Sequence, residues 1–226
     1  MNSSRLRGLI VSVQPEDASA LSPPVFVAEL AACALANGAA GVRIQGVERI
    51  AAVRKRCGDV PLVGLVKHSV AGFEPYITAT LADVGRVLDA GADVVAFDAT
   101  ARARPDGSTL AAVIELIHRR GGVAFADCAQ IEDARSAVAS GADIVGTTLC
   151  GYTPETEGAK LPALDLVSAM TALRPAFIVC EGGIGSPEQA AAAFSAGADA
   201  IVVGTAITNI DLAVRRFADA ARAHVP

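Results

Sequence analysis

The hydrophobic positions of the chain gather in short apolar runs that lack the alternation of a strand with one face in water. Runs of this kind are typical of strands buried on both faces of a parallel sheet. Longer stretches between the runs leave room for helices. The pattern predicts eight strands, at residues 8–13, 41–44, 62–66, 93–97, 122–126, 143–147, 177–180 and 200–203.

One motif occurs four times and gives the order of the elements. Residues 88–98, LDAGADVVAFD, recur with small changes at 138–148 and 194–204, and more loosely at 35–45. In each copy an Ala-rich stretch meets a glycine suited to the left-handed residue that ends a helix, and an apolar run follows at once. The repeating unit is therefore a helix, a tight turn and a strand, and its glycines are Gly38, Gly91, Gly141 and Gly197.

Strands that alternate with helices imply parallel pairing through right-handed crossovers. Helix starts are predicted near Ser22, Thr80, Ser186 and Thr208, where a hydroxyl can cap free N–H groups. Eight units in 226 residues suit an α/β fold, a (β/α)8 TIM barrel that forms a single compact domain over residues 1–226. A doubly wound open sheet is the alternative, but no Gly-x-Gly-x-x-Gly turn follows the first run.

Composition supports regular, closely packed units. The chain is 52% hydrophobic but only 4% aromatic, so Ala, Val, Leu and Ile must fill the core. The 19 basic and 24 acidic side chains give a net charge of −5 and form no basic stripe, which argues against nucleic acid as a partner. The longest uncharged stretch, residues 30–42, is too short to span a membrane.

The start of the chain resembles a signal peptide, because Arg5 and Arg7 precede an apolar run. Pro15-Glu16-Asp17 stands where a cleavage site would need small residues, so we expect a first strand and a cytoplasmic protein. The five cysteines include no Cys-x-x-Cys pair, and no three histidines or acids have the spacing of metal ligands. We therefore expect neither a disulfide framework nor a metal site.

Polar side chains stand at the C-terminal ends of almost all predicted strands, where barrel enzymes hold their active sites. A single polar residue at a strand end is common, because strands often end where the sequence becomes polar. Polar residues at almost all strand ends together favour an active site. In chain order the residues are Gln14, Arg43, Lys67, Asp98, Asp127, Thr147 with Thr148, Glu181, and Gly204 with Thr205.

Lys67 and Glu181 are the strongest candidates for catalysis. Lys67 follows an apolar strand, where desolvation would lower its pKa, so it could abstract a proton or form a Schiff base. Glu181 would place a carboxylate across the barrel mouth, and two such groups suit a reaction that removes and returns a proton. The alternatives are a lysine extended to the rim and a salt bridge between strand ends.

Two glycine turns predict a phosphate site. Gly182-Gly183 leads into the helix start at Ser186, and Gly204-Thr205 ends the last strand, so both turns expose backbone N–H groups after strands seven and eight. The loop after the fourth strand, which carries Arg102 and Arg104, is either functional or merely solvated.

These residues resemble the bacterial N-acetylmannosamine-6-phosphate 2-epimerase family over nearly the whole chain. The resemblance implies a cytoplasmic, homodimeric (β/α)8 enzyme of sialic-acid and amino-sugar catabolism. Such an enzyme interconverts N-acetylmannosamine 6-phosphate and N-acetylglucosamine 6-phosphate without a metal or an organic cofactor. The motifs that carry the resemblance are GLIVSVQ at 8–14, GVR at 41–43, PYITAT at 75–80, DAT at 98–100, RPDG at 104–107, DIVGTT at 143–148, GYTP at 151–154 and Glu181-Gly182.

The resemblance also implies roles for individual residues. Lys67 would be the base and Glu181 its acid partner, and whether the proton returns from one or the other stays open. The C2 proton of the open-chain sugar is acidified by the C1 aldehyde, and Arg43 could stabilise the resulting oxyanion. By the resemblance, Gln14, Arg43 and Asp127 would hold the sugar and its acetamido group, and Gly204 would form part of the phosphate cradle. The strand ends and glycine turns add Thr147 to the substrate-binding residues and Gly182, Gly183 and Thr205 to the phosphate site.

Three positions depart from the family pattern. Gly183, Asn209 and His68 stand where the family usually has a cation. Charge-assisted bonds contribute about 1.5–3 kcal/mol each, so we expect weaker dependence on the 6-phosphate unless backbone N–H groups or Arg102 compensate. The other functions that we weigh are a Schiff-base aldolase that uses Lys67 and a non-catalytic sugar-binding regulator.

Overall fold

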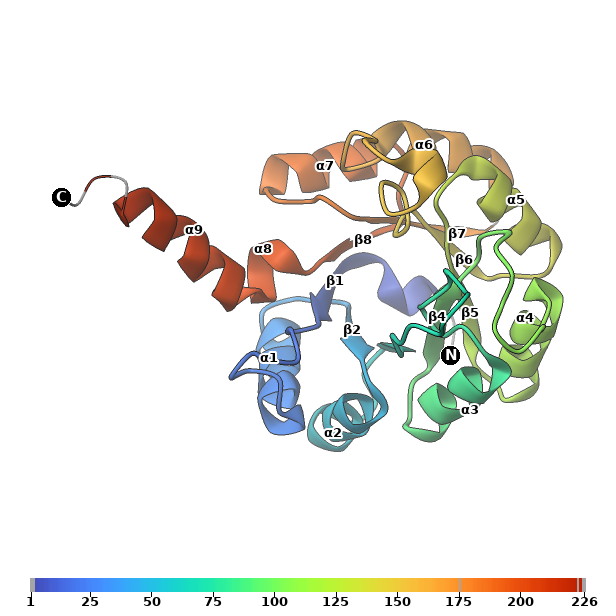
Figure 1. Ribbon diagram of the computed structural model, residues 1–226, viewed down its shortest axis with the longest axis horizontal. Helices are drawn as coiled ribbons and strands as arrows, with labels where there is room; N and C mark the ends of the chain where they lie inside the picture. The colour runs from blue at the N-terminus through green and yellow to red at the C-terminus, as the bar shows by residue number, and fades with distance from the viewer. Residues whose placement is uncertain (1–2, 175, 223, 225–226) are drawn as a thin grey trace.

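In the computed structural model, the chain closes into a barrel of eight parallel strands in sequence order, with β1 paired to β8 (Figure 1). The structure describes residues 3–174, 176–222 and 224; the remainder of the predicted domain, residues 1–2, 175, 223 and 225–226, lies outside them. The predicted (β/α)8 barrel is confirmed. Its strands are β1 Gly8–Val13, β2 Gly41–Gln45, β3 Leu62–Leu65, β4 Val94–Asp98, β5 Val123–Asp127, β6 Ile144–Gly146, β7 Phe177–Glu181 and β8 Ala200–Val203.

Helices follow the strands and surround most of the barrel (Figure 1). No described helix is both long and apolar enough to cross a membrane. The α-helices are α1 Pro24–Ala36, α2 Val47–Cys57, α3 Leu81–Asp89, α4 Leu110–Arg119, α5 Ile131–Ala139, α6 Leu164–Met170, α7 Pro187–Ser195, α8 Thr205–Thr208 and α9 Ile210–Arg222, and the 3-10 turns are Ser3–Leu6, Pro154–Thr156 and Thr171–Leu173.

Two of the four predicted hydroxyl caps are present. Thr80 and Ser186 each accept a hydrogen bond from the backbone N–H three residues on. Helices also begin near the other two positions, α1 at Pro24 and α9 at Ile210, so those predicted starts are confirmed, but the hydroxyl caps are not. No described side chain caps α1, and Asn209 caps α9 in place of Thr208, because Asn209 Oδ1 accepts the N–H of Leu212 at 2.9 Å.

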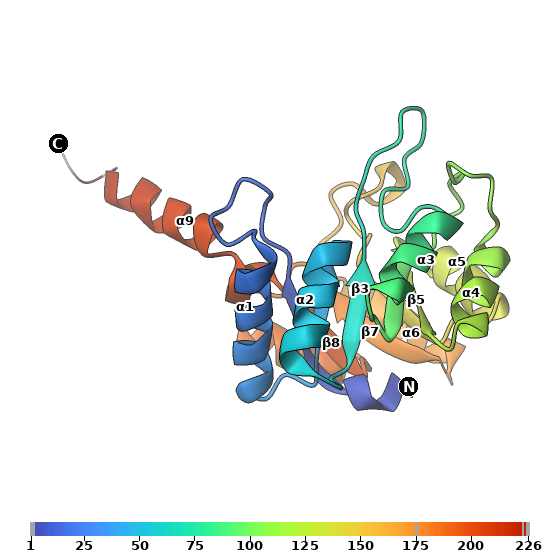
Figure 2. The same cartoon turned by 90° about the horizontal axis from the view of Figure 1, so that it is seen from below.

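The core has an inner and an outer layer. Buried side chains inside the barrel, among them Ile10, Val63 and Phe125, form one cluster, and Leu6 joins it from the 3-10 turn before β1. Side chains between the strands and the helices form the second cluster. Figure 2 shows that the loops after the strands rise on one side of the barrel, opposite the N-terminal turn.

The sequence repeat braces the barrel at the start of its even-numbered strands. In three copies, an aspartate donates its backbone N–H to the carbonyl of a residue on the preceding strand, and its carboxylate accepts the N–H of that same residue. The pairs are Asp93 with Leu62, Asp143 with Ala124 and Asp199 with Ile178. In the fourth copy Ala40 replaces the aspartate, and only the backbone bond to Leu9 is present, at 2.7 Å. The aspartates of the repeat are therefore structural, and they lie at the opposite ends of the strands from the polar strand ends.

Helix α9 departs from the expected compact packing, because it projects away from the barrel (Figures 1 and 2). None of its described residues is buried. Two polar contacts hold its first turns to the loop after β1: Ser19 donates to Asp211 at 2.6 Å, and Arg215 pairs with Glu16 at 3.0 Å. Because no described residue of α9 is buried against the barrel, the large apolar side chains of this helix are exposed to solvent.

Candidate active site

A cavity of about 630 Å³ opens at the C-terminal ends of the strands. Eight of the ten predicted site residues line it, while Asp127 and Thr147 do not. The eight are Gln14, Arg43, Lys67, Glu181, Gly182, Gly183, Gly204 and Thr205.

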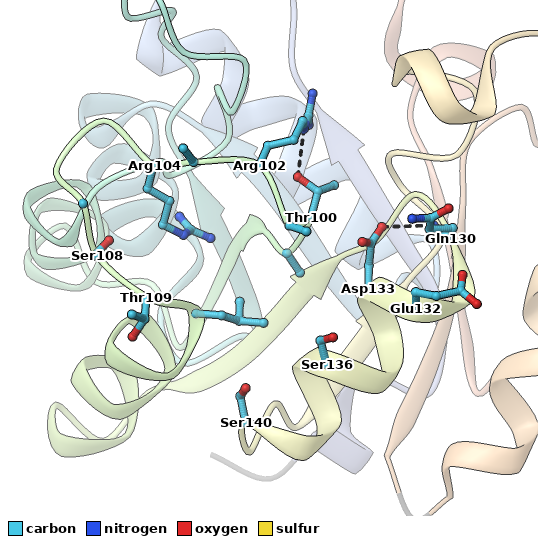
Figure 3. A pocket seen from close by; sticks show the side chains of 15 residues that line it. Thr100, Arg102, Arg104, Ser108, Thr109, Gln130, Glu132, Asp133, Ser136 and Ser140 are labelled. Carbon is cyan, nitrogen blue, oxygen red and sulfur yellow. Dashed lines mark hydrogen bonds between the residues drawn. The ribbon is translucent and has the colours of Figure 1, made fainter.

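A second cavity of about 490 Å³ lies between the loop after β4 and helix α5 (Figure 3). Two of its charged side chains, Asp133 and Arg104, already stabilise the fold through hydrogen bonds to the backbone. Asp133 accepts the N–H groups of Ala129 and Gln130, and the buried Arg104 donates to backbone carbonyl groups, including those of Thr78 and Ala79. The reactive strand-end residues are absent from its described lining, so we place the chemistry in the first cavity.

Arg43 is the fixed centre of the first cavity. Its Nη1 and Nη2 donate to the two carboxylate oxygens of Asp127 at 3.2 and 2.8 Å, and its Nε lies 3.3 Å from Glu181 Oε1. Its guanidinium stacks 5.1 Å from the centre of the Phe125 ring. Gly146 makes room for that ring, since a Cβ there would lie 2.6 Å from it. Burial disfavours the charged form of Arg43 and lowers its pKa. The carboxylates of Asp127 and Glu181 favour the charged form more strongly, so the pKa of Arg43 is raised.

Two adjacent threonines point to different places. The Thr148 hydroxyl lies 2.6 Å from Asp127 Oδ1 and 3.2 Å from Glu181 Oε2, and Thr148 lines the cavity. Thr147 is fully buried; its hydroxyl donates to the Glu181 carbonyl at 2.8 Å and accepts the Glu181 N–H at 3.0 Å. The expectation that Thr147 faces the substrate is corrected by this geometry: Thr147 ties the end of β6 to the end of β7.

Lys67 is positioned by a loop that folds back on the end of β3. Lys67 forms an isolated antiparallel β-bridge with Ile77, and Thr78 donates its N–H to the Val66 carbonyl at 2.9 Å. Thr78 has a left-handed φ of 44°, and its hydroxyl accepts the Val66 N–H at 3.3 Å, which helps to hold this uncommon conformation.

The Lys67 ammonium is exposed at the cavity mouth, and among the described residues no carboxylate oxygen lies within 4.0 Å of it. Desolvation by the cavity walls and the charge of Arg43 lower the pKa of Lys67, against the opposing effect of Glu181 and Asp127. Neutral amine, which is the form that acts as a base, is therefore more accessible than in a free lysine.

Glu181 stands on the same cavity from the end of β7, and its side chain is 14% exposed. Burial raises its pKa; the nearby Asp127 carboxylate adds to this effect, while Arg43 and Lys67 oppose it. Because Lys67 and Glu181 share the cavity without touching, a small substrate can lie between them.

The remaining walls are suited to a polar ligand. Gln14 donates to Ser12 Oγ at 2.7 Å, and its buried Oε1 has no hydrogen-bond partner within the described part of the chain. The glycine turns at residues 182–185 and 204 expose backbone to the cavity. Gly183 has a φ of 73°, and a Cβ there would lie 2.4 Å from Leu161 Cβ, so position 183 is closed to any side chain unless Leu161 moves.

Comparisons with known proteins identify the family. The family model described as "Putative N-acetylmannosamine-6-phosphate epimerase" matches residues 27–223. The chain belongs to this family.

Individual relatives are similar to this chain over most of its length, in sequence and in structure. A Synechococcus elongatus protein named "Putative N-acetylmannosamine-6-phosphate 2-epimerase" is 42% identical over 218 residues, which cover 96% of this chain and 94% of that protein. A Brucella melitensis protein named "Bifunctional enzyme NanE/NanK" is 44% identical, and the match covers 96% of this chain and 41% of that protein. The solved structure of the N-acetylmannosamine-6-phosphate 2-epimerase from Clostridium perfringens has a TM-score of 0.90 at 32% identity and covers 95% of this chain and 93% of its own.

Arg102, which the sequence left open as a replacement for the missing cations, is not part of the described wall of the first cavity. Arg102 pairs with Asp98 at 2.7 Å and lines the second cavity. His68 Nε2 lies 3.8 Å from Asp83 Oδ2, and His68 is not part of the described wall of the first cavity.

Sequence reasoning missed several polar residues of the wall, among them Ser12, Tyr76 and Arg216. Thr148, one of the predicted strand-end residues, also lines the cavity. Tyr76 lies within a family motif and could have been found from it. Arg216 lies two helical turns after Asn209, and this spacing was the available signal for it.

The cysteines near strand ends are not reactive groups. Burial raises the pKa of Cys180 to about 11 and also raises that of Cys150, so both thiols stay protonated near neutral pH. Among the described residues, no cluster of three His, Cys, Asp or Glu side chains could hold a metal ion.

Proposed function

We propose that this chain interconverts N-acetylmannosamine 6-phosphate and N-acetylglucosamine 6-phosphate in amino-sugar catabolism by removing and returning the proton on C2. Membership of the epimerase family supports this activity. The observation that carries it is the pairing of Lys67, whose pKa is lowered, with Glu181 in one strand-end cavity, where they do not contact each other.

Lys67 takes the C2 proton of the open-chain sugar, and the electrons of the C–H bond pass into the C1 carbonyl to give an enolate. Arg43 supplies fixed positive charge near the developing oxyanion. Return of a proton to the opposite face of C2 gives the epimer. The raised pKa of Glu181 suits a proton donor, and the Thr148 hydroxyl, 3.2 Å away, orients its carboxyl group.

Of the other predicted residues, some would contact the substrate and some would hold the contacting residues in place. The free Oε1 of Gln14 suits the N–H of the acetamido group, and the N–H groups at Gly182, Gly183, Gly204 and Thr205 suit the phosphate. Asp127 and Thr147 act as positioning residues, since they hold Arg43 and the end of β7.

Exchange with solvent deuterium tests the reaction. In D2O the wild-type enzyme should place deuterium at C2 of the product, and Lys67→Met should abolish this exchange. Lys55→Met, which changes an exposed lysine on α2, is the matched control and should exchange normally. Absence of exchange in the wild type would refute the epimerase, and full exchange in Lys67→Met would refute the role of Lys67.

The same variants address the route of proton return. If Glu181→Gln still washes deuterium into recovered substrate but forms no epimer, Lys67 serves one face of C2 and Glu181 the other. If Glu181→Gln forms epimer at a reduced rate, Glu181 is not the obligatory donor.

A Schiff-base aldolase is the second candidate, because a lysine with a lowered pKa is also the nucleophile of that chemistry. Borohydride added with the substrate would reduce an imine at Lys67 and add the mass of the sugar to that peptide. An epimerase that acts through an enolate stays unmodified. A sugar-binding regulator would neither exchange deuterium nor be trapped.

The proposal includes a homodimer in which α9 packs on a second copy of the chain. Large apolar side chains gather along one side of α9 and are exposed by 48% at Ile210, 61% at Val214 and 80% at Phe217. Val214→Asp should therefore shift the wild-type dimer toward monomer in sedimentation velocity, whereas Lys55→Met should not. A wild-type monomer at micromolar concentration would contradict this part.

A cytoplasmic location follows from the proposed substrate, because a phosphorylated sugar does not cross membranes unaided. The dispersed charge of the chain supports a small-molecule partner rather than nucleic acid or a membrane. Fractionation of cells that produce the protein should recover it in the cytoplasmic fraction.

A further inference from the structure

Three cationic side chains line the first cavity: Arg43, Lys67 and Arg216. Asp127 and Glu181 balance the charge of Arg43, and Lys67 stands at the reacting carbon in the proposed function. Arg216 has no carboxylate within 4.0 Å among the residues that the structure describes, and it is exposed. Its charge is therefore available to a ligand.

Helix α9 aims this side chain at the cavity. Residues seven apart share a helical face, so Arg216 lies above Asn209, and Leu212 and Ala213 between them also line the cavity. On another face, Asp211 and Arg215 hold the helix to the loop after β1. Helical side chains lean toward the N-terminus of their helix, and from position 216 this is the direction of Asn209 and the glycine turns, which line the same cavity.

The glycine turns need such a charge. They offer backbone N–H groups, but no charged side chain of their own, to a phosphate dianion. Position 183 is closed by Leu161, and position 209 carries an uncharged cap of α9. An arginine can bind a phosphate with two parallel N–H donors, which an ammonium cannot match.

We propose that Arg216 binds the 6-phosphate and gives this chain its preference for the phosphorylated sugar. The inference rests on the proposed function and names the residue that replaces the missing cations. It also reverses the expectation of weak phosphate dependence, since an unpaired guanidinium at the rim restores the charge that Gly183, Asn209 and His68 lack.

Kinetics with matched variants test the proposal. Arg216→Gln should raise KM for N-acetylmannosamine 6-phosphate by about 10- to 100-fold, leave kcat within about twofold, and leave kcat/KM for unphosphorylated N-acetylmannosamine unchanged. Arg216→Lys should recover part of the loss. Arg222→Gln removes an exposed arginine of α9 whose partner, Asp219, lies on the same helix, so it should leave all three values at the wild-type level.

Calorimetric titration with inorganic phosphate separates this inference from the proposed reaction, because it needs no turnover. Arg216→Gln should weaken phosphate binding by about 10- to 100-fold relative to wild type and Arg222→Gln. Equal KM and equal phosphate affinity in wild type and Arg216→Gln, or equal losses in Arg216→Gln and Arg222→Gln, would overturn the role of Arg216. A wild type that binds phosphate through Arg216 but fails to exchange deuterium would overturn only the epimerase.

Discussion

Arg43 and Asp127 form a two-bonded ion pair, at 3.2 and 2.8 Å, that links β2 to β5 with both side chains shielded from solvent. Burial removes hydration from both charged groups, and this cost is offset here by the two parallel hydrogen bonds of the pair, by the Thr148 hydroxyl that donates to Asp127, and by the charge of Glu181, whose Oε1 lies 3.3 Å from Arg43 Nε. The ion pair with Asp127 holds the Arg43 guanidinium in a fixed position in the wall of the cavity.

Removing the acid of this pair should cost stability as well as activity. Asp127→Ala leaves the Arg43 charge buried with only Glu181 beside it, so the free energy of unfolding should fall by about 3–5 kcal/mol. Urea unfolding measures this loss. Asp59→Ala, at a side chain that is 89% exposed, should stay within about 0.5 kcal/mol of wild type. Similar small losses in both variants would show that the pair is dispensable.

The pH dependence of turnover should report Lys67. In the proposed reaction Lys67 must be neutral to act as the base, so kcat/KM should rise with pH along a limb that lies below 10.5, the ordinary lysine value, because desolvation and Arg43 lower the pKa of Lys67. Glu181 opposes that lowering, so Glu181→Gln should move the limb to lower pH while it reduces the maximum rate. A limb that moves to higher pH in Glu181→Gln would contradict this assignment.

A substitution at Asn209 can change the charge near the phosphate site without removing the cap of α9. Asn209→Asp keeps a side-chain oxygen that accepts the Leu212 N–H, so the melting temperature should hardly change. The added negative charge beside the glycine turns should raise KM for the phosphorylated sugar by several-fold to about tenfold. The unphosphorylated sugar serves as the control, and an equal rise in its KM would point to a general distortion of the cavity.

Asp199 should contribute stability that depends on pH. It accepts the Ile178 N–H and pairs with Arg7 at 2.8 Å and Arg174 at 2.7 Å. Burial raises its pKa, but these partners outweigh burial and lower it below 3.8. A lowered carboxyl pKa stabilises the fold above the unfolded-state pKa, and this contribution disappears as pH falls through the folded-state pKa.

Asp199→Ala should therefore lower the free energy of unfolding by about 2–3 kcal/mol at pH 7, and the difference from wild type should shrink below about pH 3.8. Urea unfolding across pH measures it. Since Asp199 lies at the far end of the barrel from the cavity, kcat/KM per folded molecule should match wild type. A stability difference that does not change with pH would contradict the ionic role.

Much of the fold could be predicted from local patterns. Doubly buried strands must be apolar, so their runs in the sequence match β1 and β8 at both ends and the other strands to within two residues. The repeated glycines could be predicted as helix ends because only glycine adopts φ near 100° without strain, and Gly38, Gly91, Gly141 and Gly197 all do so. The closed barrel followed from eight such units in a row.

Residue order also predicted most of the cavity, because parallel strands bring all their C-terminal ends to one side. It could not distinguish Thr147 from Thr148, since which neighbour faces inward depends on where β6 stops, and that strand ends at Gly146. Arg102 and Arg216 were likewise decided by contacts between distant elements: Asp98 holds one away from the cavity, and α9 carries the other to its rim.

The sequence by itself thus determined the barrel, its polar end and the pairing of Lys67 with Glu181, because strand burial and strand polarity are properties of consecutive residues. Tertiary structure alone decided which charges are neutralised, which of Thr147 and Thr148 lines the cavity, and where α9 goes. Those outcomes depend on distances between residues far apart in the chain, and an amphipathic helix does not specify the surface that it will cover.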